Sequence, residues 1–490
     1  MANFLSVDLG ATSGRTVLAS FDGNRIEMRE LTRFNNPIIP VGGHLYWDLP
    51  ALYHEVLLGL KKVADEGVVL NSIGIDTWGC DFAFFGKDGQ LLGLPYCYRD
   101  SHTDGAQEKF FGKMSAKDLY GRTGIQFMNF NSVFQLDTMK RNGSSALEAA
   151  DKVLFIPDAL IYMLTGKAVC EYTVASTSQM LNPFTGDLDD DILSALGISR
   201  EKFGEMVSPG VVVGQLLPQV QEFTGLPAVD VVAVAGHDTG SAVAAVPATD
   251  EKYAYLSCGT WSLLGIETPE AVINESSFAC NFTNEGGIEG TTRFLKNICG
   301  LWLFEQCRKE FRDVPESVSE LVSLCESSEI ESLIDPDAPC FANPASMSEA
   351  IYRYCQVTGQ AVPDTPSDYI RIIFRSLALR YRQVIEMLRG FAPFEITRLH
   401  VIGGGSRNAY LMQYAADSLN MPVICGPVEG TALGNALVQI KASGMVDTLP
   451  QMRTITARSV ELKTYLPGDT AAWDELYSTF LDIQKKYNNQ

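Results

Sequence analysis

Apolar and polar residues follow the same order in two segments of the chain, one in each half. Residues 4–19 begin as an apolar run, break at Gly10, offer hydroxyl side chains and then return to apolar residues. Residues 253–266 repeat this order around Gly259. Because apolar residues resume soon after each glycine without helical spacing, both segments are predicted to form a strand, a glycine turn and a second strand.

The repeat predicts two related domains, 1–247 and 248–490. A dinucleotide-binding fold or a P-loop needs a helix directly after its glycines to hold phosphate at the helix N-terminus, and neither turn shows that helix or its glycine motif. Backbone N–H groups of a hairpin turn can instead form an anion nest, to which hydroxyl groups add donors. A single such turn is typical of an ordinary tight hairpin. Its duplication favours two turns that hold one triphosphate.

Two further apolar segments lead into carboxylates. Residues 73–81 include Asp76, and the nearly continuous apolar run 229–235, typical of a buried parallel strand, leads into Gly236-His237-Asp238-Thr239. Strand ends line the ligand crevice in α/β folds, so these carboxylates are predicted to lie at one. The small residues that follow indicate a helix start, which would place Asp238 near a helix N-terminus that favours its ionised form.

Asp238 and His237 each allow two interpretations. An ionised Asp238 could accept a proton from an alcohol, or its side chain could cap the helix by accepting backbone N–H groups. The local sequence favours neither. A neutral His237 beside a cleft could orient a substrate, or it could be an ordinary packed core residue.

Residues 399–402 are predicted to form a strand that enters the glycines 403–405 and then a helix. Three consecutive glycines allow the backbone to approach a flat ligand such as a nucleotide base, although glycine-rich turns also occur for packing. Residues 370–389 are predicted to form a long amphipathic helix with a structural role. Residues 313–366 are acidic and contain several prolines, which predicts a surface connection.

Composition narrows the possible partners and the compartment. The 490 residues include 38 Lys and Arg against 59 Asp and Glu, a formal net charge of −21, which argues against nucleic acid as a partner. The apolar runs are too short to cross a membrane and the N-terminus lacks the pattern of a signal peptide, so a cytoplasmic protein without membrane contact is predicted. The eleven cysteines are interpreted as reduced core thiols, and no zinc-site spacing is present.

Four motifs together resemble the FGGY family of carbohydrate kinases. The resemblance runs from about residue 4 to about residue 443 and implies an α/β fold of two duplicated actin-like ATPase (ribonuclease H-like) domains with a cleft between them. The motifs are Asp8-Leu9-Gly10-Ala11-Thr12-Ser13-Gly14-Arg15, Gly236-His237-Asp238, Ser257-Cys258-Gly259-Thr260 and Gly403-Gly404-Gly405-Ser406-Arg407-Asn408.

Longer strings are more specific than the glycine turns and resemble one ketose kinase within this family. That resemblance implies ATP-dependent phosphorylation of L-rhamnulose at its C1 hydroxyl, giving L-rhamnulose 1-phosphate and ADP in L-rhamnose catabolism. The strings are Ile75-Asp76-Thr77-Trp78-Gly79, Gly124-Ile125-Gln126, Asn284-Glu285-Gly286-Gly287 and Lys296-Asn297-Ile298-Cys299-Gly300-Leu301-Trp302.

The resemblance also implies a role for each matching position. Asp238 would be the catalytic base for the C1 hydroxyl, with His237, Thr239 and Gly79 beside the sugar. Asp8 would act on Mg²⁺ through water. Arg15 would be catalytic as well as phosphate-binding, and the ATP-binding residues would be Ala11, Thr12, Ser13, Gly14, Arg15, Thr260, Asn297, Glu305, Gly403, Gly404 and Gly405.

Two positions depart from the family pattern. Glu305 stands where Gln is expected, next to Gln306, which puts that one nucleotide contact in question. Gly430 stands where Ala is expected, which concerns packing more than chemistry.

Three alternatives stay open at the level of sequence. The chain could phosphorylate another ketose or polyol, such as fuculose, xylulose, ribulose or glycerol, because one methyl or hydroxyl group is read by pocket shape. It could be an actin-like or chaperone-like protein that uses ATP to drive interactions. It could also be a sugar hydrolase or isomerase with Asp76, Asp81 and Asp238 as acid/base groups. The expected partners are a small ketose and ATP, and the expected state is a monomer or a weak homo-oligomer.

Overall fold

The structure is a computed structural model that describes residues 1–468 and 470–488. The chain divides into two compact units. The first comprises Met1–Thr249, Glu267–Phe294 and Gly430–Ser459, and the second comprises Asp250–Ile266, Leu295–Glu429 and Val460–Gln490. Two segments from the second half of the sequence therefore fold with the first half. The predicted domains 1–247 and 248–490 stay a prediction.

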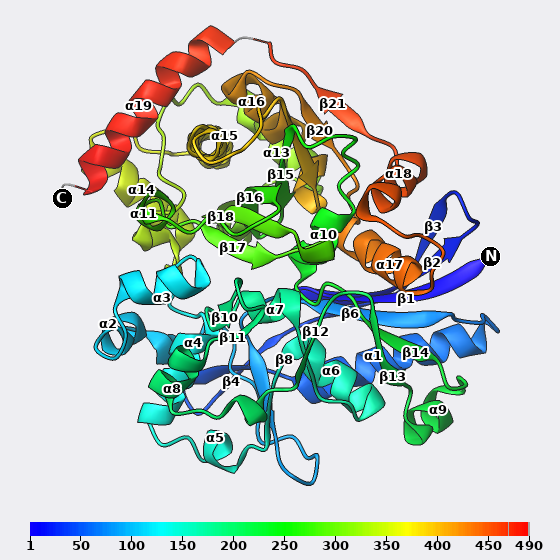
Figure 1. The fold of residues 1–490 in the computed structure, drawn as a ribbon. Coiled ribbons are helices and arrows are strands. Elements are labelled where there is room, and N and C mark those ends of the chain that lie inside the picture. The colour runs from blue at the N-terminus through cyan, green and yellow to red at the C-terminus, as the bar shows by residue number, and fades with distance from the viewer. Residues whose placement is uncertain (469, 489–490) are drawn as a thin grey trace. The chain divides into compact units, whose positions relative to one another are not determined.

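The first unit is built on a six-stranded sheet (Figure 1). In sheet order its strands are β13 (Val211–Gln215), β14 (Asp230–Ala233), β6 (Ser72–Thr77), β1 (Ala2–Leu9), β2 (Ser13–Phe21) and β3 (Ile26–Asn35). β1 pairs antiparallel with β2 and parallel with β6, and β14 pairs parallel with β6 and antiparallel with β13. The strand, turn and strand predicted around Gly10 are confirmed, as is the buried parallel strand within residues 229–235.

A second sheet has seven strands. In order they are β17 (Thr283–Gly286), β18 (Thr292–Cys299), β16 (Trp261–Thr268), β15 (Tyr253–Cys258), β19 (Arg398–Ile402), β20 (Val423–Cys425) and β21 (Lys463–Tyr465). β15 pairs antiparallel with β16 and parallel with β19, and β20 pairs parallel with β19 and antiparallel with β21. The strand, turn and strand predicted around Gly259 are therefore confirmed.

The two sheets share one topology. The order β3-β2-β1-β6-β14-β13 in the first corresponds to β18-β16-β15-β19-β20-β21 in the second. In both, the hairpin that carries the glycine turn is followed outward by two parallel neighbours and then by an antiparallel edge strand. The short sequence repeat thus marks a duplication of a whole sheet.

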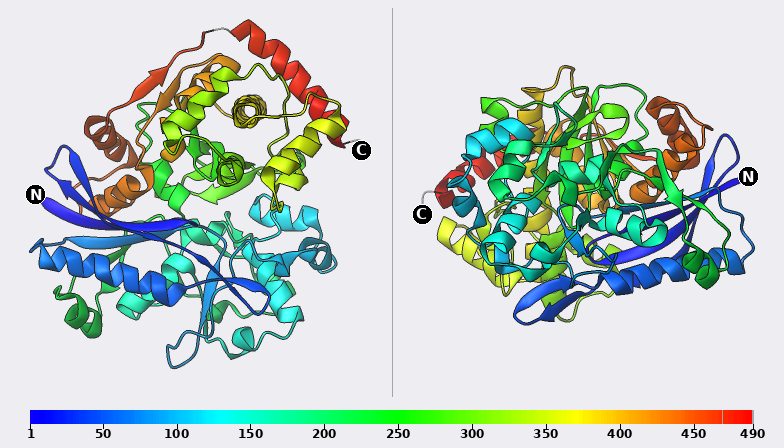
Figure 2. Two further views of the ribbon diagram at one scale, coloured as in Figure 1. Left: turned by 180° about the vertical axis from the view of Figure 1, so that it is seen from behind. Right: turned by 60° about the horizontal axis from the view of Figure 1, so that its bottom comes forward.

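Helices cover both faces of the first sheet. α1 (Leu49–Asp65) lies along one face, and α17 (Gly430–Ala442) lies on the opposite face against β1 and β6 (Figures 1 and 2). The buried residues of α1 recur every three or four positions, from Leu49 and Leu52 to Leu60 and Val63, which gives the helix one apolar face. α17 packs closely on α10 (Asp238–Ala244), the helix that follows β14.

The other helices of the first unit are α2 (Ala106–Phe111), α3 (Ala116–Thr123), α4 (Ser132–Arg141), α5 (Ser145–Ala149), α6 (Ile156–Thr165), α7 (Tyr172–Ser176), α8 (Asp190–Leu196), α9 (Pro218–Thr224), α11 (Glu275–Ala279) and α18 (Leu449–Ser459). Its short strands form four two-stranded ladders: β4 (Ile38–Val41) with β5 (His44–Trp47), β7 (Phe82–Phe85) with β8 (Lys152–Phe155), β9 (Val169–Glu171) with β12 (Glu205–Val207), and β10 (Leu181–Asn182) with β11 (Asp187–Leu188).

The helices of the second unit are α12 (Trp302–Glu310), α13 (Val318–Ser323), α14 (Met347–Thr358), α15 (Pro366–Arg389), α16 (Ala409–Leu419) and α19 (Thr470–Asn488). α15 confirms the predicted amphipathic helix, and Thr365 with Asp368 forms a capping box at its start. α16 follows the glycines 403–405 and connects the parallel strands β19 and β20. The predicted strand, glycine loop and helix are confirmed.

The prediction of a surface connection over residues 313–366 is wrong in part. The segment contains α13 and α14, and Leu321, Leu333 and Ile351 are buried in it. α14 lies between the prolines of the segment and places its buried residues at 347, 351, 354, 355 and 358. The acidic and proline-rich composition hid this helical spacing, which provides enough apolar burial to order the segment.

All eleven cysteines are free thiols, as predicted. Cys280, Cys299 and Cys340 are only partly buried, so the predicted core position applies to the other eight. Among the helices formed by the described residues, none combines the length and the apolar character that crossing a bilayer demands.

Candidate functional site

Three carboxylates of the first unit lie where its central strands end. Asp8 and Asp76 are each the next-to-last residue of their strands, and the parallel register of β1 and β6 places them opposite each other. Asp238 is the first residue of α10, and the loop before it is joined to β6 by a hydrogen bond of 2.9 Å from the N–H of Thr77 to the carbonyl of Gly236. Asp238 follows an apolar strand as predicted, whereas Asp76 still belongs to its strand, one residue before the strand ends.

Asp8 is paired with an arginine from the neighbouring strand. Arg15 lies opposite Asp8 in the antiparallel register of β1 and β2. Its Nη2 and Nε atoms lie 2.6 Å and 2.9 Å from Oδ2 of Asp8. Both side chains are mostly buried, so the ion pair is screened less by salt than a surface pair would be.

Asp76 is fully buried and has an oxygen with no partner. Its Oδ2 accepts a hydrogen bond of 2.6 Å from Nδ2 of Asn435 on α17, whereas its Oδ1 has no hydrogen-bond partner within the described residues. Burial, followed by the negative charge of Asp8, raises the pKa of Asp76 well above its ordinary value. A buried oxygen without a donor is unfavourable in a protein interior unless a cation or water completes it.

These features fit a magnesium ion. The charges of Asp8 and Asp238 both raise the pKa of Asp76, so the three carboxylates act on one another, while only Arg15 among the causes of that shift provides a compensating positive charge. Mg²⁺ prefers oxygen ligands and usually keeps several waters beside one or two carboxylates. Within the described residues, no three His, Cys, Asp or Glu side chains form a group that could hold a metal by themselves.

The turn between β1 and β2 is closed by a backbone hydrogen bond and is accessible to solvent. The N–H of Gly10 donates to the carbonyl of Ser13 at 2.9 Å, which closes the turn. Asn36, which is 4% exposed, fixes it from the side, because its backbone N–H donates to Thr12 O and its side chain donates to Gly10 O, both at 3.0 Å. Ala11 and Ser13 are partly exposed and Thr12 is exposed. Sequence reasoning missed Asn36, whose spacing from the turn has no periodic signal.

Asp238 does not cap α10. The N-cap position belongs to His237, whose side chain makes no capping hydrogen bond. Oδ1 of Asp238 accepts a hydrogen bond of 3.1 Å from Oγ1 of Thr239 and lies 3.5 Å from Nε2 of His237. Its side chain is 31% exposed and can therefore meet a ligand. Burial raises the pKa of Asp238 from its ordinary value of 3.8.

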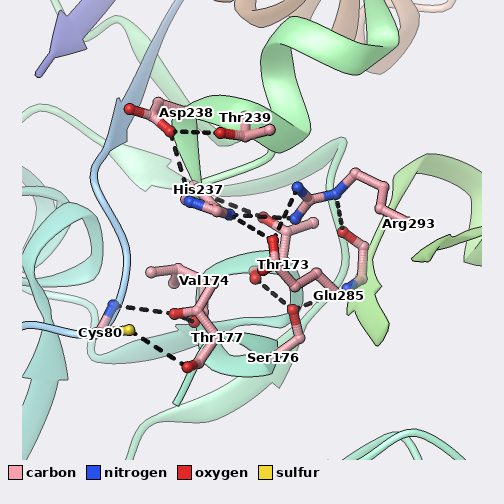
Figure 3. A network of polar contacts seen from close by, with 12 residues as sticks. Cys80, Thr173, Val174, Ser176, Thr177, His237, Asp238, Thr239, Glu285 and Arg293 are labelled. Carbon is pink, nitrogen blue, oxygen red and sulfur yellow. Dashed lines mark hydrogen bonds and ion pairs between the residues drawn. The ribbon is translucent and has the colours of Figure 1, made fainter. Parts of the chain in front are cut away.

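The loop after β6 needs a glycine at position 79. A side chain there would place its Cβ 2.8 Å from Oγ1 of Thr177. That hydroxyl instead accepts a hydrogen bond of 2.9 Å from the N–H of Cys80, whose φ of 69° lies in the left-handed region. Figure 3 shows Thr177 against the Cys80 backbone and sulfur. Thr177 fixes this loop, and nothing in the local sequence distinguishes it from other buried threonines.

Asp81 is a structural carboxylate. It is fully buried and accepts hydrogen bonds from the indoles of Trp47 and Trp78, the N–H of Tyr98 and the amide of Gln135, at 2.6–3.1 Å. Burial raises the pKa of Asp81 to about 6 against the effect of these donors. With both oxygens engaged, Asp81 has no atom to offer a substrate, which argues against the hydrolase or isomerase hypothesis that used it.

In the second unit, the turn at Gly259 is joined to the start of α12. Gly259 donates its N–H to Trp261 O at 2.9 Å and accepts the N–H of Leu301 at 3.0 Å, and Thr260 accepts the N–H of Trp302 at 3.1 Å. Asn297 lies on β18, just before α12, and Glu305 lies in its first turn. Thr260 and α12 are therefore held together, whereas the assignment of these residues to ATP stays a prediction.

The glycines 403–405 meet two different needs. A Cβ at Gly403 would lie 2.9 Å from the carbonyl of Cys258, and one at Gly405 would lie 2.3 Å from its sulfur. A Cβ at Gly404 would meet nothing within 4 Å. Close packing on the end of β15 therefore explains Gly403 and Gly405. Only Gly404 has the open space that a ligand contact requires.

Sequence reasoning also missed the residues that surround His237. Glu285 on β17 and Arg293 on β18 contact its imidazole, and Thr173 accepts its backbone N–H (Figure 3). Glu171 accepts the N–H of the preceding residue, Gly236. Glu285 belongs to one of the strings behind the family resemblance, which was the only signal available for it.

Comparison with known proteins places the chain among sugar kinases along nearly its whole length. Residues 3–245 match the sequence model of the FGGY family of carbohydrate kinases, N-terminal domain, and residues 254–443 match that of the C-terminal domain. The rhamnulokinase of Bacteroides thetaiotaomicron is 57% identical over 479 residues, which cover 98% of each chain. The rhamnulokinase of Oceanobacillus iheyensis is 39% identical over 461 residues, covering 94% of this chain and 97% of its own.

Solved structures show the same fold at much lower identity. A ligand-bound xylulose kinase from Lactobacillus acidophilus has a TM-score of 0.82 at 16% identity and covers 99% of this chain and 98% of its own. A Plasmodium falciparum glycerol kinase with ADP has a TM-score of 0.77 at 17% identity and covers 100% and 97%. The predicted α/β fold of two duplicated actin-like ATPase domains is confirmed.

Proposed function

Since the chain belongs to the FGGY family of carbohydrate kinases, we propose that it transfers the γ-phosphoryl group of ATP to the C1 hydroxyl of L-rhamnulose. The products would be L-rhamnulose 1-phosphate and ADP, in the breakdown of L-rhamnose. The observation that carries the proposal is the 57% identity to a rhamnulokinase over 98% of both chains. Its free thiols support the reducing cytoplasm as the compartment.

Asp238 is suited to act as the base. Its carboxylate is partly exposed, and Thr239 is its one hydrogen-bond donor within the described residues. As Asp238 takes the proton from the C1 hydroxyl, that oxygen bonds to the γ-phosphorus and the bond from phosphorus to the ADP oxygen breaks. His237, Thr239 and Gly79 would lie beside the sugar.

The phosphate side of the reaction needs donors and positive charge. The turn formed by residues 11–14 would supply backbone N–H groups and hydroxyls, and Arg15 would supply charge. Asp8 and Asp76 would hold Mg²⁺, which when bound would offset the charge of the phosphates. Asp8 keeps Arg15 in place through their ion pair, so the two functions depend on each other.

The second unit would bind the nucleotide. Its candidate residues are Thr260, Asn297, Glu305, Gly403, Gly404 and Gly405. Support differs among them, because Gly404 lies in open space and the Glu305 side chain is 41% exposed, whereas Gly403 and Gly405 already have a packing role. We therefore place the closest backbone approach to adenosine at Gly404.

An ADP-release assay with Mg·ATP and a panel of ketoses and polyols tests the proposal. L-rhamnulose should give the highest kcat/KM, and fuculose, xylulose, ribulose and glycerol should each give at least about tenfold less, since a changed hydroxyl leaves a buried polar group unpaired. ADP release that is independent of any sugar would favour the actin-like or chaperone-like alternative. A higher kcat/KM for another member of the panel would reassign the substrate.

The base assignment also predicts a pH profile. Only the ionised form of Asp238 can accept a proton, and its raised pKa means that this form is lost as pH falls through a value above 3.8. At saturating substrate, kcat should fall on the acid side with a midpoint above that ordinary value. Stopped-point ADP assays from neutral pH downward measure it. A midpoint at or below 3.8 would contradict burial as the environment of the base.

A further inference from the structure

The imidazole of His237 contacts a buried ion pair that has no role in the proposed reaction. Arg293 is fully buried, and its Nη1 lies 3.0 Å from Oε2 of Glu285, which is itself 4% exposed. The Nη2 atom of Arg293 lies 3.2 Å from Nδ1 of His237. Figure 3 shows both side chains reaching the imidazole from the side opposite Asp238.

The ion pair is fixed to the scaffold. The Nε of Arg293 donates to the carbonyl of Gly286 at 2.8 Å. The N–H of Gly286 in turn donates to Oγ of Ser176 in α7 at 2.8 Å. Burial by itself would raise the pKa of Glu285, but the charge of the Arg293 guanidinium beside it opposes burial, and the pKa of Glu285 is lowered. Glu285 is therefore ionised and balances the guanidinium.

The backbone of His237 is fixed as well. Its N–H donates to Oγ1 of Thr173 at 3.2 Å, and that hydroxyl donates to Oε2 of Glu171 at 2.7 Å. Oε2 of Glu171 also accepts the N–H of Gly236 at 2.9 Å. With the backbone held at this point, the remaining freedom of His237 lies in its ring and in the nitrogen that carries its proton.

The groups around Nδ1 determine which ring nitrogen of His237 carries the proton. A guanidinium can only donate, and Nη2 of Arg293 has no other partner in the part of the chain that the structure describes. If Nδ1 carried hydrogen, the buried Nη2 would lose its acceptor, which is costly. If Nδ1 carries no hydrogen, it accepts a hydrogen bond from Nη2. Oε2 of Glu285 lies 3.2 Å from Nδ1 and remains in its ion pair with Nη1 at 3.0 Å. A protonated Nδ1 would instead donate to Oε2, but Oε2 keeps its ion pair with Nη1 in both arrangements, whereas the buried Nη2 has an acceptor only in the second.

We infer that Arg293 and Glu285 are positioning residues of the sugar site, which act through His237 by fixing its proton on Nε2. Nε2 lies on the side of Asp238, 3.5 Å from its Oδ1. Its N–H would donate to the oxygen next to the reacting hydroxyl, which in a ketose is the C2 carbonyl. This use of the N–H rests on the proposed function, whereas the tautomer itself does not.

A paired substitution tests the inference without leaving one charge buried alone. Glu285→Gln combined with Arg293→Met removes both charges and the donor to Nδ1. We expect KM for L-rhamnulose to rise at least about tenfold, as for the loss of a hydrogen bond, while KM for ATP changes less than about twofold. In a His237→Gln background the same pair of substitutions should add no further rise, because its effect passes through the imidazole.

Nitrogen NMR of ¹⁵N-histidine protein reads the tautomer directly. The His237→Gln variant identifies the His237 signals among those of the five histidines. The unsubstituted protein should show His237 with a bare Nδ1 and a protonated Nε2, and the paired variant should lose this fixed pattern. If the paired variant does not fold, Arg293→Lys replaces it, since it keeps the charge and one donor and should raise KM less than tenfold while retaining the pattern.

Asp137→Asn is the matched control for the loss of a buried charge. Asp137 on α4 is fully buried, forms ion pairs with Lys113 and Arg141, and has no ion pair with a residue of the candidate site in the described structure. The Asp137→Asn variant should leave the His237 signals and both KM values unchanged. A protonated Nδ1 in the unsubstituted protein, or a rise in KM that persists in the His237→Gln background, would overturn the inference. Failure to phosphorylate any ketose would instead refute the proposed function and leave the tautomer result standing.

Discussion

Replacing Asp238 with Asn is expected to lower kcat for the ketose by about 10²–10⁴-fold, while the Kd for ATP changes by less than about threefold. The amide keeps the size of the side chain and can still accept the hydroxyl of Thr239, so α10 should keep its start. It cannot take up a proton at the pH of the assay. The loss should therefore fall on the chemical step and spare nucleotide binding.

Two measurements separate this loss from damage to the fold. Single-turnover phosphorylation reports the chemical step, and ATP titration by calorimetry reports binding. Asp137→Asn, an Asp to Asn change at a buried position away from the site, should keep kcat within about twofold. If Asp238→Asn turned over ketose at nearly the normal rate, another group would have to be the base.

Local patterns were enough to predict the strands, turns and helix that carry the candidate site residues. The apolar runs around Gly10 and Gly259 predicted both hairpins, and the run before Gly236 predicted β14. The small residues after Asp238 predicted α10. These predictions succeeded because strand and helix periodicities are visible within about ten residues, and because strand ends in α/β sheets gather at one edge.

The partners of the site residues could not be predicted in this way. Asn435 contacts Asp76 from 359 positions away, and Arg293 contacts His237 from 56 positions away. Such contacts depend on how complete elements pack, and a single buried polar residue has no period. The same reason applies to Gly405. A side chain there would collide with the sulfur of Cys258, a residue distant in sequence, and no feature of the 403–405 loop itself indicates this.

The contact between α17 and α10 is another feature that depends on the packing of distant elements, and here it is backbone atoms that meet. Both helices are nearly free of large side chains where they meet: α10 reads Asp-Thr-Gly-Ser-Ala-Val-Ala, and α17 places Gly434 against it. Through Asn435 the same helix fixes Asp76. A small change on α17 should therefore reach two carboxylates of the site, although the helix comes from the far end of the sequence.

Replacing Gly434 with Ala should consequently destabilise the protein and slow the reaction together. A Cβ at this position would lie 1.7 Å from the carbonyl oxygen of Ser241 and 2.6 Å from its carbonyl carbon, which are backbone atoms that no rotamer change can move. We expect the free energy of unfolding to fall by about 3 kcal/mol or more, as for severe overpacking. Because the displaced α10 begins with Asp238, kcat should fall by about 10²-fold in the protein that remains folded.

Gly121→Ala provides the control for this prediction, since it makes the same chemical change at an exposed position of a helix. Gly121 lies in α3, and a Cβ there would meet nothing within 4 Å. It should raise the free energy of unfolding by about 0.5–1 kcal/mol, because alanine loses less conformational freedom in a helix than glycine does. Thermal unfolding of the two variants should therefore move in opposite directions. If Gly434→Ala kept both its midpoint and its kcat, α17 would not set the position of α10, and the coupling between this helix and the base would have to be abandoned.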